Sequence, residues 1–401
     1  MPRLLLTSSA AAIAALALTT AAAVAQIAVS AQDAKVRLVD GKVTTVKDGA
    51  DNAVLIDLSS NPPKVIAELK LPASVVGPPS SVAVSPSEEI ALITSAEKID
   101  PADATKRVPN DQVTVIELNT KAPGVIAKVT ARIKGATIEP PKPKVLSTLT
   151  AGKGAAGVSI NRAGTLAIVA NRGEGTLSVF SIKGKAVTAL PDKVKIGDEK
   201  SGPSAIVFSA DGKRALVTRD GDNRISMLDI DGTKVTVNPR VITAGLRPYG
   251  ADISGKGDVA VVANIGTGSG DADTISLIDL VANPPRVVIT VTAGPTPEGI
   301  KMSPDGQYVA VTVMNGTNKP ATDPFFKEKG KLVVFRRAGL LLTDVGKWCQ
   351  GIAWSKNGRT VVAQCMVEEM LFVFGFDGRQ LRPMDPIRVK GGPAGIRTAE
   401  K

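Results

Sequence analysis

The side chains of this chain that could do chemistry are carboxylates and guanidinium groups, because its 401 residues include no histidine and only two cysteines. The lack of histidine excludes a Ser-His-Asp triad, an imidazole general base and His-ligated zinc, copper or haem. Carboxylate chemistry and hard-cation binding through oxygen ligands remain. The acidic clusters at 220–222 and 271–273 lack the spacing of a calcium loop, so we interpret them as turns and assign no metal, no cofactor and no catalytic residue.

These side chains are positioned by a repeated sequence unit. The unit occurs six times in full and begins a seventh time. Each unit opens with a turn such as Pro297-Glu298-Gly299, followed by an apolar run, a turn such as Ser303-Pro304-Asp305-Gly306 and three more runs. The glycine position of the opening turn falls at 81, 157, 205, 250, 299, 351 and 395, so all but the first spacing lie between 44 and 52 residues. Such a period with four strands is typical of a β-propeller blade. The first spacing is longer, and we interpret its polar segments 96–110 and 119–144 as inserted loops.

The seventh unit is cut short after Pro393–Arg397, and the N-terminal region contains the runs that it lacks. We therefore predict an all-β fold, a seven-bladed propeller with four-stranded blades, whose last blade joins one C-terminal strand to N-terminal ones. Val36–Val39 would be its second strand, Ala53–Leu58 its third and Val65–Leu69 its fourth. Such closure removes free sheet edges. An open stack of repeats is the alternative, but it leaves the split unit without a purpose.

The first 25 residues have the pattern of a secretory signal peptide: Arg3, an apolar stretch and the small-residue motif Ala23-Val24-Ala25. We expect cleavage after residue 25, with a second possible site after 31, and a single propeller domain over 32–401. An uncleaved anchor is the alternative. We expect a periplasmic or secreted protein, with no membrane span after this segment.

Cys349 and Cys365 lie in one repeat, on either side of the turn Ser355–Gly358. If Ser355 and Arg359 face each other across that turn, the same register places the two cysteines opposite each other. An exported protein keeps such a bond, so we predict a disulfide. A register slip of one residue would turn the two side chains to opposite faces.

The opening turns and the loops between second and third strands share one rim of a propeller, and here the loops 95–111, 265–273 and 314–329 are elaborated. Function tends to reside on elaborated loops of a rigid scaffold, so we predict a binding face on this rim. Its predicted binding residues, around the channel mouth, are Asn171, Arg172, Arg219, Arg247, Tyr249, Asn264, Glu298, Phe325, Phe326 and Trp348. Four of the rim residues are arginines: Arg172, Arg219, Arg224 and Arg247. They either form one cationic arc or are neutralised locally by Glu174, Asp220 and Asp222, and the sequence leaves both possibilities open.

The runs Thr165–Asn171, Val259–Asn264 and Tyr308–Thr312, with flanking elements such as Ser303–Gly306 and Thr274–Asp279, resemble the YVTN β-propeller repeat family. The resemblance covers nearly all of the chain after the leader and implies the propeller fold in an exported binding or surface protein. Related seven-bladed chains include lactonases and the non-catalytic heavy subunits of amine dehydrogenases. No set of charged residues here matches a lactonase motif that could be carried over.

Three functions remain open. We expect an exported, monomeric, non-catalytic propeller that binds a protein or an anionic ligand on the elaborated rim. The first alternative is a lactonase-like hydrolase that uses carboxylates such as Glu298, with Arg247 as an anion clamp. The second is a polyanion or single-stranded nucleic-acid binder, consistent with the net charge of +11. The Lys and Arg residues are spread over every repeat and only 3% of residues are aromatic, so stacking platforms are scarce.

Overall fold

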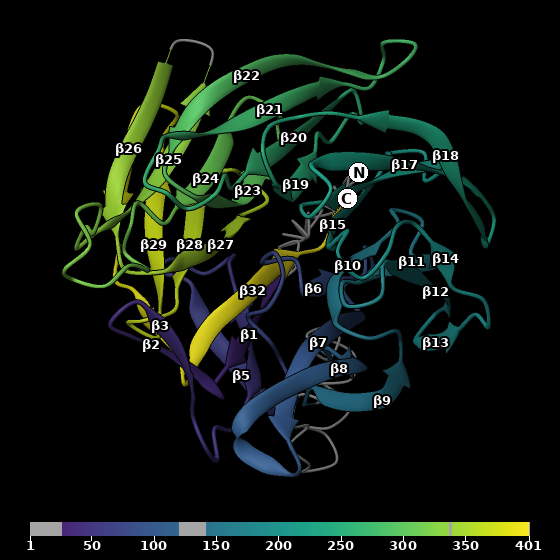
Figure 1. Cartoon of the computed structure of the whole chain (residues 1–401), viewed down its shortest axis with the longest axis horizontal. Coiled ribbons are helices and arrows are strands. Elements are labelled where there is room, and N and C mark those ends of the chain that lie inside the picture. The colour runs from purple at the N-terminus through teal and green to yellow at the C-terminus, as the bar shows by residue number, and fades with distance from the viewer. Residues whose placement is uncertain (1–25, 120–141, 337–338, 401) are drawn as a thin grey trace, which may run out of the picture.

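Seven sheets stand around a central axis in the computed structural model, which describes residues 26–119, 142–336 and 339–400 (Figure 1). Each sheet has four or five antiparallel strands, with its innermost strand at the channel. This confirms the predicted all-β, seven-bladed propeller. The predicted signal peptide lies outside the described residues. Across the described ranges, no helix is long and apolar enough to cross a membrane.

Six blades are built from continuous chain. The first consists of β6 (Val82–Val84), β7 (Ile90–Asp100), β8 (Asp103–Glu117) and β9 (Lys144–Thr150). The second consists of β10 (Ala155–Ile160), β11 (Leu166–Asn171), β12 (Thr176–Lys183), β13 (Ala186–Ala189) and β14 (Val194–Lys195). The third consists of β15 (Pro203–Phe208), β16 (Arg214–Arg219), β17 (Arg224–Asp231) and β18 (Lys234–Ile242). The fourth consists of β19 (Pro248–Ile253), β20 (Val259–Asn264), β21 (Asp273–Asp279) and β22 (Arg286–Gly294). The fifth consists of β23 (Pro297–Met302), β24 (Val309–Val313), β25 (Gly330–Arg336) and β26 (Gly339–Val345). The sixth consists of β27 (Cys349–Trp354), β28 (Thr360–Cys365), β29 (Met370–Phe376), β30 (Leu381–Pro383) and β31 (Ile387–Arg388).

The seventh blade is closed by both chain ends, as predicted. Its strands follow the order β32 (Gly392–Thr398), β1 (Ile27–Asp33), β4 (Asn52–Asp57), β5 (Lys64–Lys70), and Figure 1 shows the yellow β32 beside the purple β1. The prediction for the second strand was wrong. That strand is β1, buried along its whole length, whereas Val36–Val39 is β2 and pairs with β3 (Lys42–Thr45) in a separate hairpin. The hairpin turn, Asp40-Gly41, has positive φ at both residues, which suits the type I′ turn of a two-residue hairpin.

In three blades the glycine of the opening turn is required because consecutive blades meet there, although the equivalent positions 81 and 205 hold Ser and Ala. A Cβ on Gly157, Gly250 or Gly299 would overlap the carbonyl oxygen of the middle turn residue in the next blade. Threonines near the ends of second strands also bond the carbonyl of the middle turn residue in the next blade. Thr94, Thr218 and Thr312 each donate a hydrogen bond to one, and the Thr218 Oγ1 to Tyr249 O distance is 2.7 Å. These contacts fix the middle turn residues at the channel wall.

The predicted disulfide between Cys349 and Cys365 is confirmed, although the register assumed at the turn was wrong by one residue. Ser355 N–H bonds to the carbonyl of Thr360, not Arg359, so Ile352 pairs with Ala363. A β-bulge between Cys349 and Ile352 then shifts the register by one residue and places the cysteines opposite each other. Four other blades carry a bulge at the same place in the first strand, so it belongs to the repeat.

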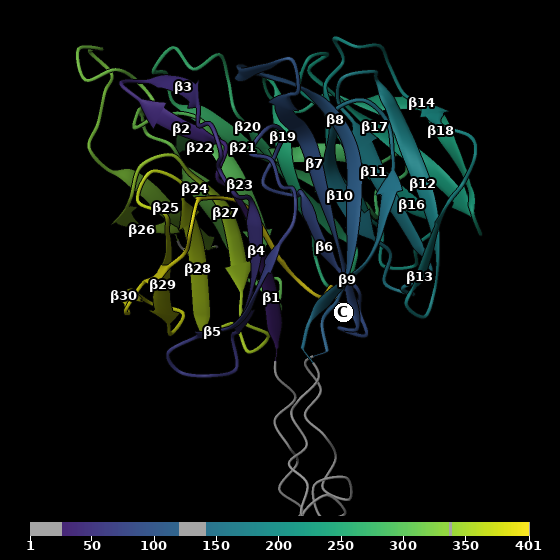
Figure 2. The ribbon, with the colours of Figure 1, turned by 90° about the horizontal axis from the view of Figure 1, so that it is seen from below.

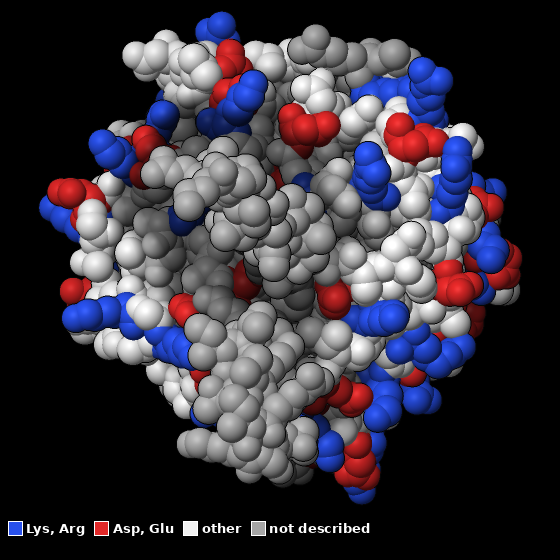
Figure 3. Space-filling view, turned by 180° about the vertical axis from the view of Figure 1, so that it is seen from behind, with Lys and Arg blue, Asp and Glu red and all other residues white. Residues whose placement is uncertain are grey.

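Over the described residues, one rim of the propeller carries the longer insertions, as predicted. Figure 2 shows β2, β3 and the extended ends of β7 and β8 at the same end of the molecule. The segment expected to be a loop at 96–110 is instead a continuation of the β7–β8 ladder, pairing Glu97 with Pro109 and Ile99 with Arg107. Most of the second expected loop, 119–144, lies outside the described residues. On the face seen from behind, Lys and Arg alternate with Asp and Glu around the periphery (Figure 3).

Candidate functional site

A cavity of about 390 Å³ opens on the elaborated rim, at the mouth of the central channel. The β2–β3 hairpin, the β5–β6 connection, the β7–β8 extension and the opening turns of three blades all contribute to its wall. The lining residues are Leu38, Gly41, Val43, Val75, Val76, Gly77, Glu97, Arg107, Arg172, Tyr249, Glu298, Met314, Asn318, Trp348 and Gln350. The structure therefore brings four of the predicted binding residues into one cavity: Arg172, Tyr249, Glu298 and Trp348.

Glu298 lies at the buried end of this cavity, in the middle of an opening turn. Its side chain is 6% exposed, and its Oε2 atom has no hydrogen-bond partner in the protein. Burial raises the pKa of Glu298 to about 8; a hydrogen bond from Gln350 and the positive charges of Arg247 and Arg172 partly oppose this shift. The carboxyl group is therefore mostly protonated at neutral pH and ionises slightly above it.

A cluster of two arginines and one aspartate holds the cavity wall beside Glu298. Arg172 forms a two-pronged ion pair with Asp220, with Nη2 to Oδ2 at 2.9 Å, and Arg247 Nη2 lies 3.1 Å from the same Oδ2 atom. Burial alone would raise the pKa of Asp220, but the hydrogen bond and charge of Arg172 outweigh it and hold that pKa below its usual range. The Arg172 guanidinium also lies 5.6 Å from the centre of the Tyr249 ring.

Three of the four arginines of the predicted arc, Arg172, Arg219 and Arg247, form local ion pairs. Arg219 pairs with Asp222, as Arg172 and Arg247 pair with Asp220, while Glu174 pairs with Lys193. Of the two possibilities left open by the sequence, local pairing is the one that these contacts favour.

Sequence reasoning did not assign the second ion pair of the cavity, which comes from the β7–β8 extension. Arg107 Nη1 lies 2.7 Å from Glu97 Oε2, and both side chains are largely buried. Burial raises the pKa of Glu97, with Arg107 opposing the shift. The polar composition of the 96–110 segment had suggested a loop, and only its position on the elaborated rim pointed toward the site.

Three predicted binding residues instead hold the frame together. Asn171 accepts a hydrogen bond from Gly152 N and donates to Thr176 and Ser178, and Asn264 repeats this pattern with Gly245, Thr274 and Ser276. Arg219, at the equivalent position of the blade between them, donates to the Ile196 carbonyl and to Ser226. Each side chain links its second strand to the third strand and to the loop that enters the blade. They do not line the cavity.

The predicted aromatic residues separate. Phe325 is 49% exposed and its ring lies against Gly270, whereas Lys347 lies over the ring of Phe326. Trp348 is buried in an apolar cluster with Val36, Val75, Met314, Met366 and Ala394. Only Trp348 reaches the cavity.

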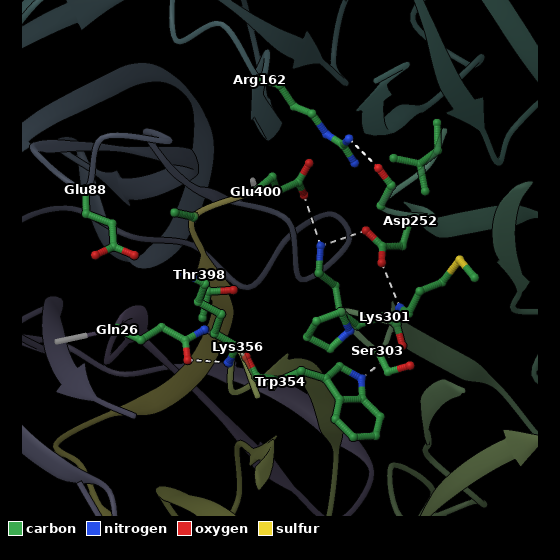
Figure 4. Close-up of a pocket in the computed structure, with 15 residues that line it drawn as sticks. Gln26, Glu88, Arg162, Asp252, Lys301, Ser303, Trp354, Lys356, Thr398 and Glu400 are labelled. Atoms are coloured by element: carbon green, nitrogen blue, oxygen red, sulfur yellow. Dashed lines mark hydrogen bonds and ion pairs between the residues drawn. The ribbon is translucent and has the colours of Figure 1, made fainter. Parts of the chain in front are cut away.

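A second cavity, of about 300 Å³, opens at the opposite end of the channel (Figure 4). Lys301 lies between two carboxylates there, with Nζ 2.7 Å from Asp252 Oδ1 and 3.0 Å from Glu400 Oε1. The C-terminal segment also forms a bridge from Ala399 to Val84. These contacts hold the C-terminal segment at this end of the channel, and they satisfy the charged groups of Lys301, Asp252 and Glu400.

The rim cavity is better suited to chemistry, because it contains a carboxyl oxygen that is buried and unpartnered. A carboxyl group that titrates near pH 8 can accept and return a proton close to neutral pH. The adjacent guanidinium group supplies a fixed positive charge. Among the described residues, no group of three or more Asp, Glu or Cys side chains is arranged to hold a metal ion.

No protein-family model and no curated protein sequence matches the chain. Solved structures do match its fold. A Bacteroides uniformis protein provisionally described as a 6-phosphogluconolactonase superimposes with a TM-score of 0.65 and 16% identity, over 94% of this chain and 99% of the other. The periplasmic gluconolactonase PpgL of Pseudomonas aeruginosa gives a TM-score of 0.62 and 15% identity, over 93% and 99%.

The fold is that of the lactonase-like, YVTN-type propellers. The resemblance drawn from the repeats is thereby confirmed for the architecture. At these identities the likeness establishes the fold alone. Hydrazine synthase of Kuenenia stuttgartiensis matches as well, with a TM-score of 0.59 and 17% identity over 80% of this chain and 90% of that one. Function must therefore be argued from the rim cavity.

Proposed function

We propose that this protein is an extracytoplasmic lactone hydrolase whose active site is the rim cavity. The observation that carries the proposal is Glu298, a buried carboxyl group with an unpartnered oxygen at the inner end of that cavity. The lactonase-like neighbours support this function better than the non-catalytic binding protein that we expected from the sequence.

Glu298 acts as general base and then as general acid. Its ionised carboxylate takes a proton from a water molecule, and the resulting hydroxide adds to the lactone carbonyl carbon. The tetrahedral intermediate collapses by breaking the bond between that carbon and the ring oxygen, which takes the proton back from Glu298. One lactone and one water thus give one hydroxy acid, and the carboxylate is regenerated. A base with a pKa near the working pH is the effective choice for such a cycle.

The positive charge of Arg172 lies close enough to Glu298 to lower its pKa, so it also acts on the oxyanion of the intermediate. Asp220 holds this guanidinium in place through paired hydrogen bonds. The Tyr249 phenol stays neutral because burial raises its pKa. It forms part of the wall beside Arg172.

The disulfide and the similarity to a periplasmic gluconolactonase support a location outside the cytoplasm. Cleavage of a leader after residue 25 would leave β1 intact. Cleavage after residue 31 would remove five β1 residues, Ile27–Ala31, which pair with both β32 and β4. We therefore favour the first site.

The test is the initial rate of hydrolysis of D-glucono-1,5-lactone, corrected for the uncatalysed reaction. We expect the wild-type protein to accelerate it and Glu298→Gln to lose at least a hundredfold, the usual scale of general acid–base catalysis. Glu68→Gln, on the outer strand β5, is the matched control and should behave as wild type. Equal rates for wild type and Glu298→Gln would refute the assignment. Binding of the lactone without turnover would instead restore the non-catalytic reading.

A further inference from the structure

The cationic side chains described at the rim cavity already contact carboxylates. Arg107 pairs with Glu97, whereas Arg172 and Arg247 share Asp220, and the second of their two charges is balanced by Glu298 when that carboxyl is ionised. A phosphate group would need cations free to replace its lost hydration. The cavity therefore favours a ligand without net charge.

One side of the cavity is apolar. Leu38, Val43, Val75, Val76, Met314 and Trp348 contribute this side, and the polar groups Glu298, Gln350, Tyr249 and Arg172 contribute the other. Glu298, Gln350 and Tyr249 are each less than 10% exposed, as are Val75, Met314 and Trp348, whereas Val43 on the hairpin is 42% exposed. The apolar side therefore runs from the buried part of the cavity, beside the polar groups, outward to the hairpin.

The apolar side is held in place by packing. Val36 of β2 is buried with Val75, Met314 and Trp348 in one cluster. At the hairpin turn, the Ala321 N–H donates to Asp40 Oδ1 at 3.3 Å, and Gly41 packs directly against Pro320. Two insertions from different blades therefore brace each other over the channel mouth, and the wall is formed before a ligand arrives.

We infer that the substrate is an uncharged lactone carrying an aliphatic or aromatic substituent, with its ring carbonyl at Glu298 and its substituent along the β2–β3 hairpin. This inference rests on the proposed function. It selects against phosphorylated sugar lactones. A cavity of about 390 Å³ holds a six-membered ring together with a substituent of several carbons.

The first experiment compares kcat/KM for δ-valerolactone, δ-octalactone and δ-decalactone with that for 6-phosphoglucono-1,5-lactone. We expect kcat/KM to rise about fourfold for each methylene that packs against the wall. The phosphorylated lactone should be the poorest substrate. A preference for the phosphorylated lactone, or no dependence on chain length, would overturn the inference.

Two hairpin variants test where the substituent lies. Val43→Asp places a charge on the cavity wall and should reduce the preference for δ-decalactone over δ-valerolactone at least tenfold. Val39→Asp is the matched control, because Val39 is 55% exposed on the same hairpin but does not line the cavity. It should keep the wild-type preference. Equal effects of the two variants would contradict the placement.

Calorimetry with alkyl-substituted δ-lactams separates this inference from the proposed function, because a lactam is not turned over on the timescale of the measurement. Tighter binding with longer alkyl chains, weakened by Val43→Asp, supports the inference even if no lactone is hydrolysed. Failure of the long-chain lactams to bind overturns it, whatever the hydrolysis assays show.

Discussion

Replacing Glu298 by Gln should change how stability depends on pH, and the size of the effect follows from the burial of this carboxyl. Burial raises its pKa from 4.5 to about 8 in the folded protein. A carboxyl with a raised folded-state pKa binds its proton more tightly when folded. Its contribution to stability is fully present below pH 4.5 and is lost as pH rises through 8. The glutamine amide cannot ionise, so the variant lacks this dependence.

The wild-type protein should therefore lose stability relative to Glu298→Gln between about pH 5 and pH 8. One pKa unit corresponds to about 1.4 kcal/mol, so the difference in unfolding free energy should change by about that amount per pH unit, and by about 4 kcal/mol between pH 5 and pH 9. Above pH 8 the difference should level off.

The assay is urea unfolding at half-unit pH steps from 5 to 9, with the disulfide kept oxidised. Glu68→Gln replaces an exposed carboxyl in the same way and should show no comparable drift against wild type. A difference between wild type and Glu298→Gln that stays constant with pH would show that Glu298 titrates normally. The acid–base role would then lose its physical basis.

Three further predictions concern the stability of the propeller. Gly299→Ala should destabilise the protein by about 3 kcal/mol, because the new Cβ overlaps the Gln350 carbonyl of the next blade. Gly255→Ala should change little in the same urea titration, because its Cβ would make only an ordinary van der Waals contact, 3.4 Å from the Pro304 carbonyl oxygen. Glu400→Gln should lower the unfolding free energy by about 1–3 kcal/mol, because it removes one of the two carboxylates around the buried Lys301. An unchanged midpoint of urea unfolding would mean that other contacts hold the C-terminal segment. The double variant Cys349→Ser, Cys365→Ser should lower the unfolding free energy by about 3 kcal/mol, because the disulfide no longer closes a loop of 16 residues in the unfolded chain. Mass spectrometry that finds free thiols in the wild-type protein would rule out the bond.

The repeat pattern was sufficient to predict the architecture, because the opening turn recurs in every blade and the contact between blades requires its glycine in three of them. The next blade's carbonyl leaves no room for a side chain at Gly157, Gly250 or Gly299. The second strand of the closing blade was missed because Ile27–Asp33 follows directly after the leader-like segment, whereas Val36–Val39 offered an equally apolar run. Asp40-Gly41 was the local signal that the latter begins a hairpin.

The site could be predicted only in part. Tyr249 and Glu298 were found because the middle residue of each opening turn faces the channel, a position that the repeat itself defines. Asn171 and Asn264 share the rim, but their amides complete hydrogen bonds within the blade, which the sequence does not show. Glu97 and Arg107 reach the cavity through long-range packing of an insertion, and no local pattern in a single sequence encodes such a contact.

The central claim is that Glu298 turns over a lactone at the rim cavity, and the pH dependence of kcat/KM tests it most directly. The free-enzyme base is ionised in about one molecule in eleven at pH 7 and in about ten in eleven at pH 9, if its pKa is about 8. After subtraction of the uncatalysed rate, kcat/KM for a neutral lactone should therefore rise about tenfold between pH 7 and pH 9, and the rise should be absent in Glu298→Gln. A profile that is flat through pH 8, or that rises equally in the variant, would contradict the account.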